Sequence, residues 1–126
     1  PMFRLADVHL MLAESVLRGG SGATRADALE LINELRERAY GDMSGNITDG
    51  QLDLDFILDE RGRELHWEMH RRQDLIRFNN FSTSGVWQFK GGSIDGSTTE
   101  AFRDLYPIPS SQIAAYNGGL RQNEGY

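Results

Sequence analysis

The sequence predicts a mainly α-helical protein, and three observations support this fold class. Apolar residues recur at spacings of three and four along three long stretches, which is the periodicity of a helix with a buried face. Segments rich in glycine, asparagine, aspartate and serine separate these stretches. Pro107 and Pro109 forbid a helix near the C-terminus and favour an extended segment. We therefore expect helix hairpins, long irregular loops and an extended proline-rich C-terminal segment.

The first stretch predicts a helix over residues 3–18 with apolar residues on two sides. One stripe comprises Leu5, Val8, Leu12 and Val16. A second stripe, at spacings of seven, comprises Phe3, Leu10 and Leu17. A helix that is apolar on two sides usually lies between neighbours.

The second stretch predicts a helix over residues 25–39. Thr24 is the expected N-cap, and Asp27 completes an approximate capping box. The apolar stripe comprises Ala28, Leu31, Ile32, Leu35 and Ala39. The short glycine-rich turn before Thr24 joins both helices into an antiparallel hairpin, which is one helical repeat unit without a second copy.

A third helix is predicted over residues 54–70, after a loop at residues 40–53. Asp53 or Asp55 is the expected cap. The apolar face comprises Leu54, Ile57, Leu58, Leu65 and Met69. A shorter helical piece continues to Phe78.

Residues 79–99 predict an irregular glycine-rich and serine-rich loop, with a short strand at residues 86–89. An extended segment follows at residues 105–109. Ser110 or Ser111 is expected to cap a short helix through Tyr116, which Asn117 and two glycines close.

The composition excludes several classes of protein. The absence of cysteine excludes a disulfide scaffold, a thiolate metal site, a thiol nucleophile and a lipidated cysteine within this stretch. A net charge of −6 argues against a nucleic-acid partner. The sequence has neither a signal-peptide pattern nor a run of about 18 apolar residues. Lys90 is the single lysine among 13 basic residues, and the arginines predict many ordered ion pairs.

Two patterns resemble metal sites. His66 and His70 have the i, i+4 spacing of zinc ligands, but Glu68 lies about 200° round the predicted helix from His66 and no third ligand is evident. A calcium-like loop has Ile47 where a glycine is needed. The ligand positions of that loop would be Asp42, Ser44, Asn46 and Asp53. We therefore expect no metal site and no cofactor.

The sequence also predicts no catalytic residue and hence no enzyme. Carboxylate pairs for glycoside hydrolysis could be drawn from one acidic cluster, but the spacing selects no pair. The cluster comprises Asp53, Asp55, Asp59 and Glu60. Ser110 and Ser111 lack the G-x-S-x-G context of a nucleophile.

Several aromatic residues could present flat faces to sugar rings. They are Trp67, Trp87, Phe89, Tyr106 and Tyr116. Trp67 lies on the predicted third helix, where packing in a core or against another domain is favoured. Trp87 lies in a glycine-rich loop and is expected to be the exposed one, which makes it the candidate sugar contact. Packing of Trp87 against the helices is the favoured alternative.

Five segments together resemble one known family. In chain order they are FRLADVHLMLAES, ALELINELRERAYG, ILDERGRELHWEMHRRQDLIRF, WQFKGG and LYPIPSSQI…NGGLRQNEGY. They resemble the C-terminal part of SusD/RagB proteins, which are outer-membrane nutrient-binding lipoproteins of Bacteroidetes. The most specific pieces are residues 60–78 and the pair 105–109 with 122–126. The family commonly has glycine at the position of Met69, which replaces a small residue on the predicted helix, and proline at that of Glu124.

The resemblance implies tetratricopeptide-like helix hairpins in a lipid-anchored surface protein that captures glycans or oligosaccharides. Such a protein acts with a SusC-like TonB-dependent transporter. Residues 1–126 would be its C-terminal region, with the anchoring cysteine and most recognised glycan contacts upstream. We therefore carry no binding residue over, and we expect the remainder of the same polypeptide to be a packing partner.

Two alternative functions remain open beside glycan capture. A helical-hairpin adaptor would bind a soluble protein and no polysaccharide. A glycosidase would release sugar and depend on Asp59 or Glu60. An upstream signal peptide that ends in a cysteine would favour the lipoprotein over both.

Overall fold

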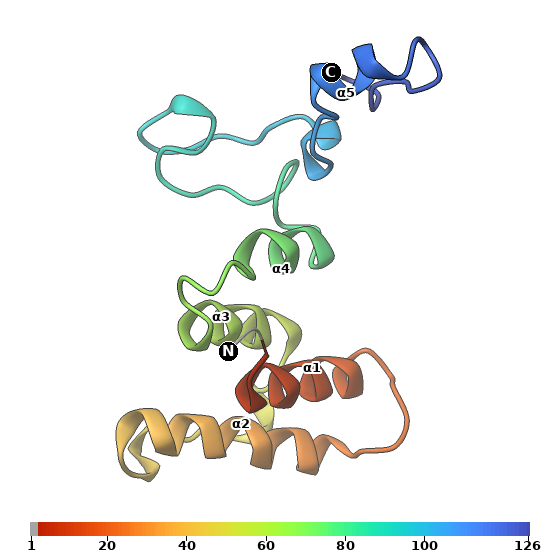
Figure 1. Cartoon of the computed structure of the whole chain (residues 1–126). Coiled ribbons are helices and arrows are strands. Elements are labelled where there is room, and N and C mark those ends of the chain that lie inside the picture. The colour runs from red at the N-terminus through yellow and green to blue at the C-terminus, as the bar shows by residue number, and fades with distance from the viewer. Residues whose placement is uncertain (1–2) are drawn as a thin grey trace. The chain divides into compact units, whose positions relative to one another are not determined.

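The computed structural model describes residues 3–126 and confirms the mainly α-helical fold class (Figure 1). The α-helices are α1 (Leu5–Leu17), α2 (Arg25–Tyr40), α3 (Leu54–Glu64), α4 (Arg71–Arg77) and α5 (Ser110–Ala115). Short 3-10 turns lie at Met43–Gly45, Asp49–Gln51, Lys90–Gly92 and Ala101–Asp104. The described part of the chain has no strand, and none of its helices has the length and apolar character needed to cross a membrane. The chain divides into two compact units, Pro1–Asp74 and Leu75–Tyr126.

The first unit is built around α1, which packs on both α2 and α3 (Figure 1). The side chains that meet in its core come from all three helices and from the segment between α2 and α3. They are Ala6, Leu10, Ala13, Ala28, Ile32, Leu35, Ile47, Leu52, Ile57 and Leu58, together with Leu65 at the end of α3. Buried alanines on α1 and α2 leave room for these two helices to pack against each other as the predicted hairpin.

The buried face of α1 differs from the predicted stripes. Leu5, Val8 and Leu12 are exposed, whereas the small residues Ala6 and Ala13 are buried. Leu10 of the second predicted stripe is buried, as expected. The prediction counted large apolar side chains and so missed the contribution of the two alanines. The end of α2 shows a smaller error, because the expected core residue Ala39 is exposed.

The predicted caps of α2 and α3 are confirmed. The backbone N–H of Asp27 donates to Thr24 Oγ1 at 3.2 Å, and the Thr24 N–H donates to Asp27 Oδ2 at 2.7 Å, which completes the capping box. The Thr24 N–H and hydroxyl both donate to the Asp27 carboxylate, and these two bonds hold the pKa of Asp27 below its ordinary value. At α3, Asp53 Oδ1 accepts from the Phe56 N–H at 2.7 Å.

The third helix ends at Glu64, so the predicted helix over residues 54–70 is wrong beyond that residue. Trp67 and Met69 have φ angles of 64° and 66°, in the left-handed region that interrupts a right-handed helix. Arg4 supplies a physical reason for the ending, because its guanidinium donates to the main-chain carbonyl of Glu64. Helix-end carbonyls commonly accept from basic side chains in this way. Met69 therefore lies in a turn and is 94% exposed rather than on the apolar face of α3.

The second unit is mostly irregular, and its N-terminal half lacks the strand predicted at residues 86–89. Phe89 has a φ of 65°, and the Lys90 N–H donates to the Trp87 carbonyl at 3.1 Å. These features make a turn where the sequence predicted extended backbone. Within Leu75–Tyr126, all of which the structure describes, Leu75 is the single buried apolar side chain.

The extended proline-rich tail is present, and the last residues of the chain hold it. The Gln122 side-chain amide accepts from the Ile108 N–H at 2.8 Å and donates to the Ile108 carbonyl at 2.9 Å. Asn123 Nδ2 donates to the Tyr106 carbonyl at 2.7 Å, and the Tyr126 hydroxyl donates to that of Leu105 at 2.8 Å. We call this arrangement the C-terminal clasp.

The short helix after the tail begins one residue earlier than a serine cap requires. Its N-cap is Pro109, which makes no side-chain cap bond, and Ser110 is the first helical residue. The predicted capping role of Ser110 or Ser111 is therefore wrong. Because proline fixes φ near the value of a helix start, Pro109 can begin the turn without a capping side chain.

Candidate functional site

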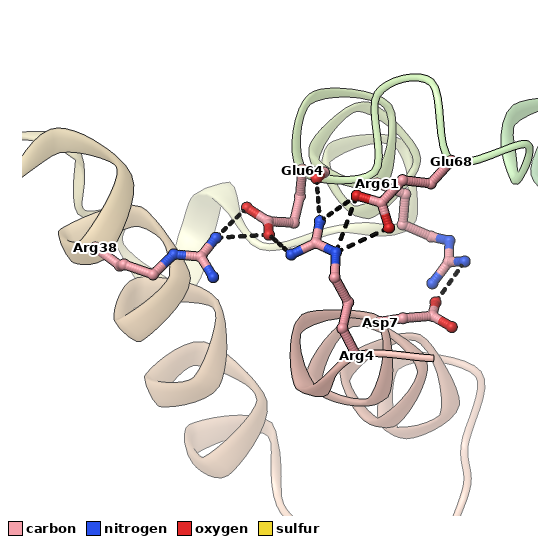
Figure 2. A network of polar contacts seen from close by, with 6 residues as sticks. All are labelled: Arg4, Asp7, Arg38, Arg61, Glu64 and Glu68. Atoms are coloured by element: carbon pink, nitrogen blue, oxygen red, sulfur yellow. Dashed lines mark hydrogen bonds and ion pairs between the residues drawn. The ribbon is translucent and has the colours of Figure 1, made fainter. Parts of the chain in front are cut away.

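A buried ion-pair cluster lies at the centre of the first unit. The Arg61 guanidinium on α3 contacts Asp7 of α1 and Asp74 of α4, each at 2.9 Å. Arg61 is 3% exposed and Asp74 is 1% exposed. Buried charges persist only when they are paired, so this cluster fixes three helices to one another. Figure 2 shows Asp7 and Arg61 facing each other from neighbouring helices.

A second network surrounds the end of α3 (Figure 2). Arg4 contacts Glu64 at 2.6 Å and Glu68 at 2.8 Å, and Arg38 of α2 reaches Glu64 at 2.6 Å. Hydrogen bonding from Arg4 holds the pKa of Glu68 below its ordinary value, and the same bond raises the pKa of the Arg4 guanidinium. Each charge here has an opposite partner, so the network joins helices and offers no group poised for proton transfer. The arginine-rich composition predicted this kind of pairing.

The acidic cluster considered for glycoside hydrolysis does not form a catalytic pair. Glu60 is buried between Arg36 and Arg63, at 2.7 Å and 2.8 Å from the two guanidinium groups. Asp59 is exposed and, as the adjacent helical residue, projects about 100° away from Glu60. Asp53 is occupied as the cap of α3.

The metal-like patterns are also separated or occupied. His66 lies beyond the end of α3, so the pair with His70 has no common helical face, and its ring stacks on Trp67 at a centroid distance of 5.5 Å. Asp42 Oδ1 accepts from the Ser44 N–H at 2.8 Å, and hydrogen bonds from Ser44 hold the pKa of Asp42 below its ordinary value. No group of three or more metal-ligating side chains occurs among residues 3–126.

Trp87 lies beside a buried lysine in the second unit. Lys90 Nζ sits 4.5 Å from the centroid of the Trp87 ring and donates to the Ser82 carbonyl at 2.8 Å. It also donates to the carbonyls of Phe81 and Gly85. The Phe81 ring lies 6.0 Å from the Trp87 ring at an interplanar angle of 37°. A cation and an aromatic ring therefore fix the orientation of a tryptophan that is 41% exposed.

The sequence did not predict the role of Lys90, although its being the single lysine was a usable signal. The exposure ranking of the tryptophans was also wrong. Trp67 is 90% exposed, far more than Trp87, because its segment is a left-handed turn and not part of the third helix. The loss of apolar periodicity after Leu65 could have indicated this.

A shallow hollow lies where the N-terminal ends of α2 and α3 approach each other. Its lining includes Arg25, Leu52 and Asp53. The Arg25 guanidinium is bound to Asp49 at 2.7 Å and to the Leu52 carbonyl at 2.6 Å. Because Asp53 is the helix cap, the main polar groups of the hollow are already engaged within the chain.

Known proteins resemble this chain over all or most of its length. The curated starch-binding protein SusD of Bacteroides thetaiotaomicron is 40% identical over 128 residues, which cover 100% of this chain and 21% of that protein. SusD-like protein P25 of Formosa agariphila is 44% identical over 84 residues, covering 61% of this chain and 15% of that protein. A solved structure of surface glycan-binding protein A from Bacteroides thetaiotaomicron matches with a TM-score of 0.70 and 28% identity, over 98% of this chain and 24% of that one.

The chain thus spans about a fifth of the length of the first of these curated relatives. The family model described as the SusD family matches residues 1–126. The helical fold agrees with the structural match. On these grounds the chain belongs to the SusD family.

Proposed function

We propose that residues 1–126 are the C-terminal region of a longer glycan-binding or oligosaccharide-binding protein. That protein is lipid-anchored at the outer membrane, faces the cell exterior and acts with a SusC-like TonB-dependent transporter. The observation that carries the proposal is the 40% identity to a starch-binding protein across all of this chain and only 21% of that relative. The glycan-binding name of the structural neighbour supports the same ligand class.

Within such a protein, the first unit serves as scaffold. Several of its charged side chains, including Arg61 and Arg4, are engaged in ion pairs that link its segments. Binding a neutral sugar needs positioned hydrogen bonds and flat apolar faces rather than reactive groups. The function proposed therefore requires no catalysis.

Trp87 is the proposed sugar contact within this stretch. Stacking on a sugar ring requires an aromatic face held at a fixed angle, and Lys90 and Phe81 hold the Trp87 ring in this way. An immobilised ring loses little conformational entropy on binding. Trp67 has a weaker support, since its ring stacks on the exposed His66.

The test is a binding assay on the full-length protein with a panel of soluble polysaccharides that includes starch. We expect retarded migration in native gels that contain one of them, and no release of reducing sugar. Retention of a soluble protein from the same cells, with no polysaccharide bound, would replace this proposal with the adaptor function. Sugar release that depends on Asp59 or Glu60 would replace it with a glycosidase.

The contribution of Trp87 is tested separately with Trp87→Ala in the same full-length protein. We expect the loss of one stacked ring to cost about 1 kcal/mol of binding free energy, which weakens the affinity about fivefold. Trp67→Ala is the matched control and is expected to retain the affinity of the parent. An unchanged affinity in Trp87→Ala would remove Trp87 from the site without touching the proposed ligand class.

A further inference from the structure

The outward side of α1 carries no charged residue. Leu5 is 68% exposed, and Val8, Met11, Leu12 and Ser15 are exposed as well. At 100° per residue these five positions fall within about 120° of arc on one side of the helix. We call this set the outer face of α1. The two acidic residues of α1, Asp7 and Glu14, are both buried on the opposite side.

This arrangement is the reverse of a solvent-facing helix surface, as the neighbouring helices demonstrate. The exposed positions of α2 include Arg25, Asp27, Glu30, Glu34 and Arg38. Those of α3 include Asp55, Asp59 and Arg63. Helices that face water carry charges on the exposed side, whereas a helix apolar on both sides is enclosed. By this comparison α1 has the surface of an internal helix.

In a stack of helix hairpins, the position of a hairpin determines whether its outer surface is polar. Each hairpin contacts its neighbours, and the terminal hairpin of a stack has a polar outer surface because it faces water. Here α3 packs on one side of α1 and α2 on another, and the remaining outer face is apolar. The α1–α2 hairpin is therefore built as an interior member of a stack and not as its end.

We propose that the outer face of α1 is the docking site for a helix from the segment of the same polypeptide that precedes residue 1. This inference rests on the proposed function, in which residues 1–126 are the C-terminal region of a longer chain. The relatives provide the length for such a segment, because this chain covers 21% of one and 24% of another. The docked helix presents an uncharged apolar stripe, since a charge there would be buried without a partner.

A second copy of the chain is a poorer occupant. Helix α1 has 13 residues and is therefore about 20 Å long and about 10 Å wide. A contact made by this face alone buries about 200 Å² on each partner, against roughly 800 Å² in a standard specific interface. A segment of the same polypeptide needs no such area, because it is already tethered and loses little translational freedom on docking.

The absence of cysteine from residues 1–126 allows a direct test by thiol labelling of the full-length protein. Val8→Cys and Met11→Cys place thiols on the outer face of α1. Ala26→Cys and Ala39→Cys place them at exposed positions of α2 and are matched helical controls. The labelling rate with a small maleimide is measured for each variant, after subtraction of the rate of the parent protein, and circular dichroism checks that each variant is folded.

We expect the two α1 thiols to react at least about tenfold more slowly than the two α2 thiols, at every protein concentration. Equal rates would overturn the inference. Slow labelling of the α1 thiols that disappears on dilution would overturn it in favour of a second copy. If the full-length protein binds a glycan but its α1 thiols react quickly, the docking inference is wrong and the proposed function stands. If the α1 thiols react slowly but no glycan binds, the docking inference is supported and the proposed ligand class is wrong.

Discussion

At the scale of single residues, Arg61 is the side chain on which the first unit depends most. Arg61→Met removes the guanidinium that pairs with the buried carboxylates of Asp7 and Asp74. Loss of one partner from a buried ion pair costs about 3–5 kcal/mol, more than most single substitutions. We expect a large drop in the urea midpoint of the helical signal of the full-length protein.

Arg63→Met is the matched control for Arg61→Met, because Arg63 lies on the same helix and pairs with Glu60 at 2.8 Å. Its side chain is half exposed, so the loss should stay near or below about 1 kcal/mol. Similar losses in both variants would contradict the assignment of Arg61 as the central cation.

Met69 is a second residue for which the direction of the change in stability on replacement can be predicted. Its φ of 66° is a backbone conformation that costs a non-glycine residue roughly 1–2 kcal/mol. Glycine removes this strain but adds freedom to the unfolded chain, worth about 0.4–1 kcal/mol. Met69→Gly should therefore raise the free energy of unfolding by roughly 0.5–1 kcal/mol.

Met43→Gly is the control for Met69→Gly. Met43 is also exposed, but it lies in a right-handed 3-10 turn, so glycine should destabilise the protein there. Thermal melts of both full-length variants would show shifts of opposite sign. A glycine at this position, as the resemblance implies for the family, would fit this left-handed backbone rather than a small residue on a helix.

At the scale of elements, the C-terminal clasp joins the two chain segments that were most specific in the sequence resemblance. The Gln122 amide both accepts from and donates to Ile108, as a neighbouring strand would. Gln122→Glu removes the donor and places a carboxylate against the Ile108 carbonyl. If the closed clasp loses about 1 kcal/mol of stability, its open state becomes about fivefold more populated.

Trypsin cleavage after Arg121 measures this opening, because Arg121 immediately precedes the clasp residue. We expect cleavage of the full-length Gln122→Glu variant to be about fivefold faster than that of the parent. Gln112→Glu is the control, since Gln112 is an exposed residue of α5. An equal increase in both variants would mean that added charge, and not the lost bond, is responsible.

The elements also show what sequence patterns can and cannot predict. The helices over residues 5–17 and 25–40, the capping box at Thr24 and the extended tail follow from local rules and were predicted. The end of α3 depends on Arg4, which is 60 residues away along the chain. The Lys90 site likewise depends on carbonyl groups that only the folded loop brings together. Contacts of either kind leave no periodicity in the sequence.

At the scale of the whole molecule, the two units differ in the size of their internal apolar cores. The first unit has a core shared by three helices, whereas Leu75 is the single buried apolar side chain of Leu75–Tyr126. Burial of one leucine contributes about 2 kcal/mol. Ordering each residue costs at least about 1 kcal/mol, so this burial and local hydrogen bonds such as the clasp are not expected to order the unit by themselves.

A peptide that comprises residues 75–126 alone should therefore be largely unfolded. We expect a far-ultraviolet circular dichroism spectrum without helical minima and narrow amide proton dispersion in NMR spectra. In the full-length protein, hydrogen exchange at the Thr99 N–H, which donates to the Ser82 carbonyl at 2.9 Å, should instead be protected. The comparison isolates the stabilisation that comes from outside residues 75–126, because the covalent sequence of the unit is the same in both samples. A folded peptide with the same Thr99 protection would show that Lys90 and the clasp are sufficient to order this unit.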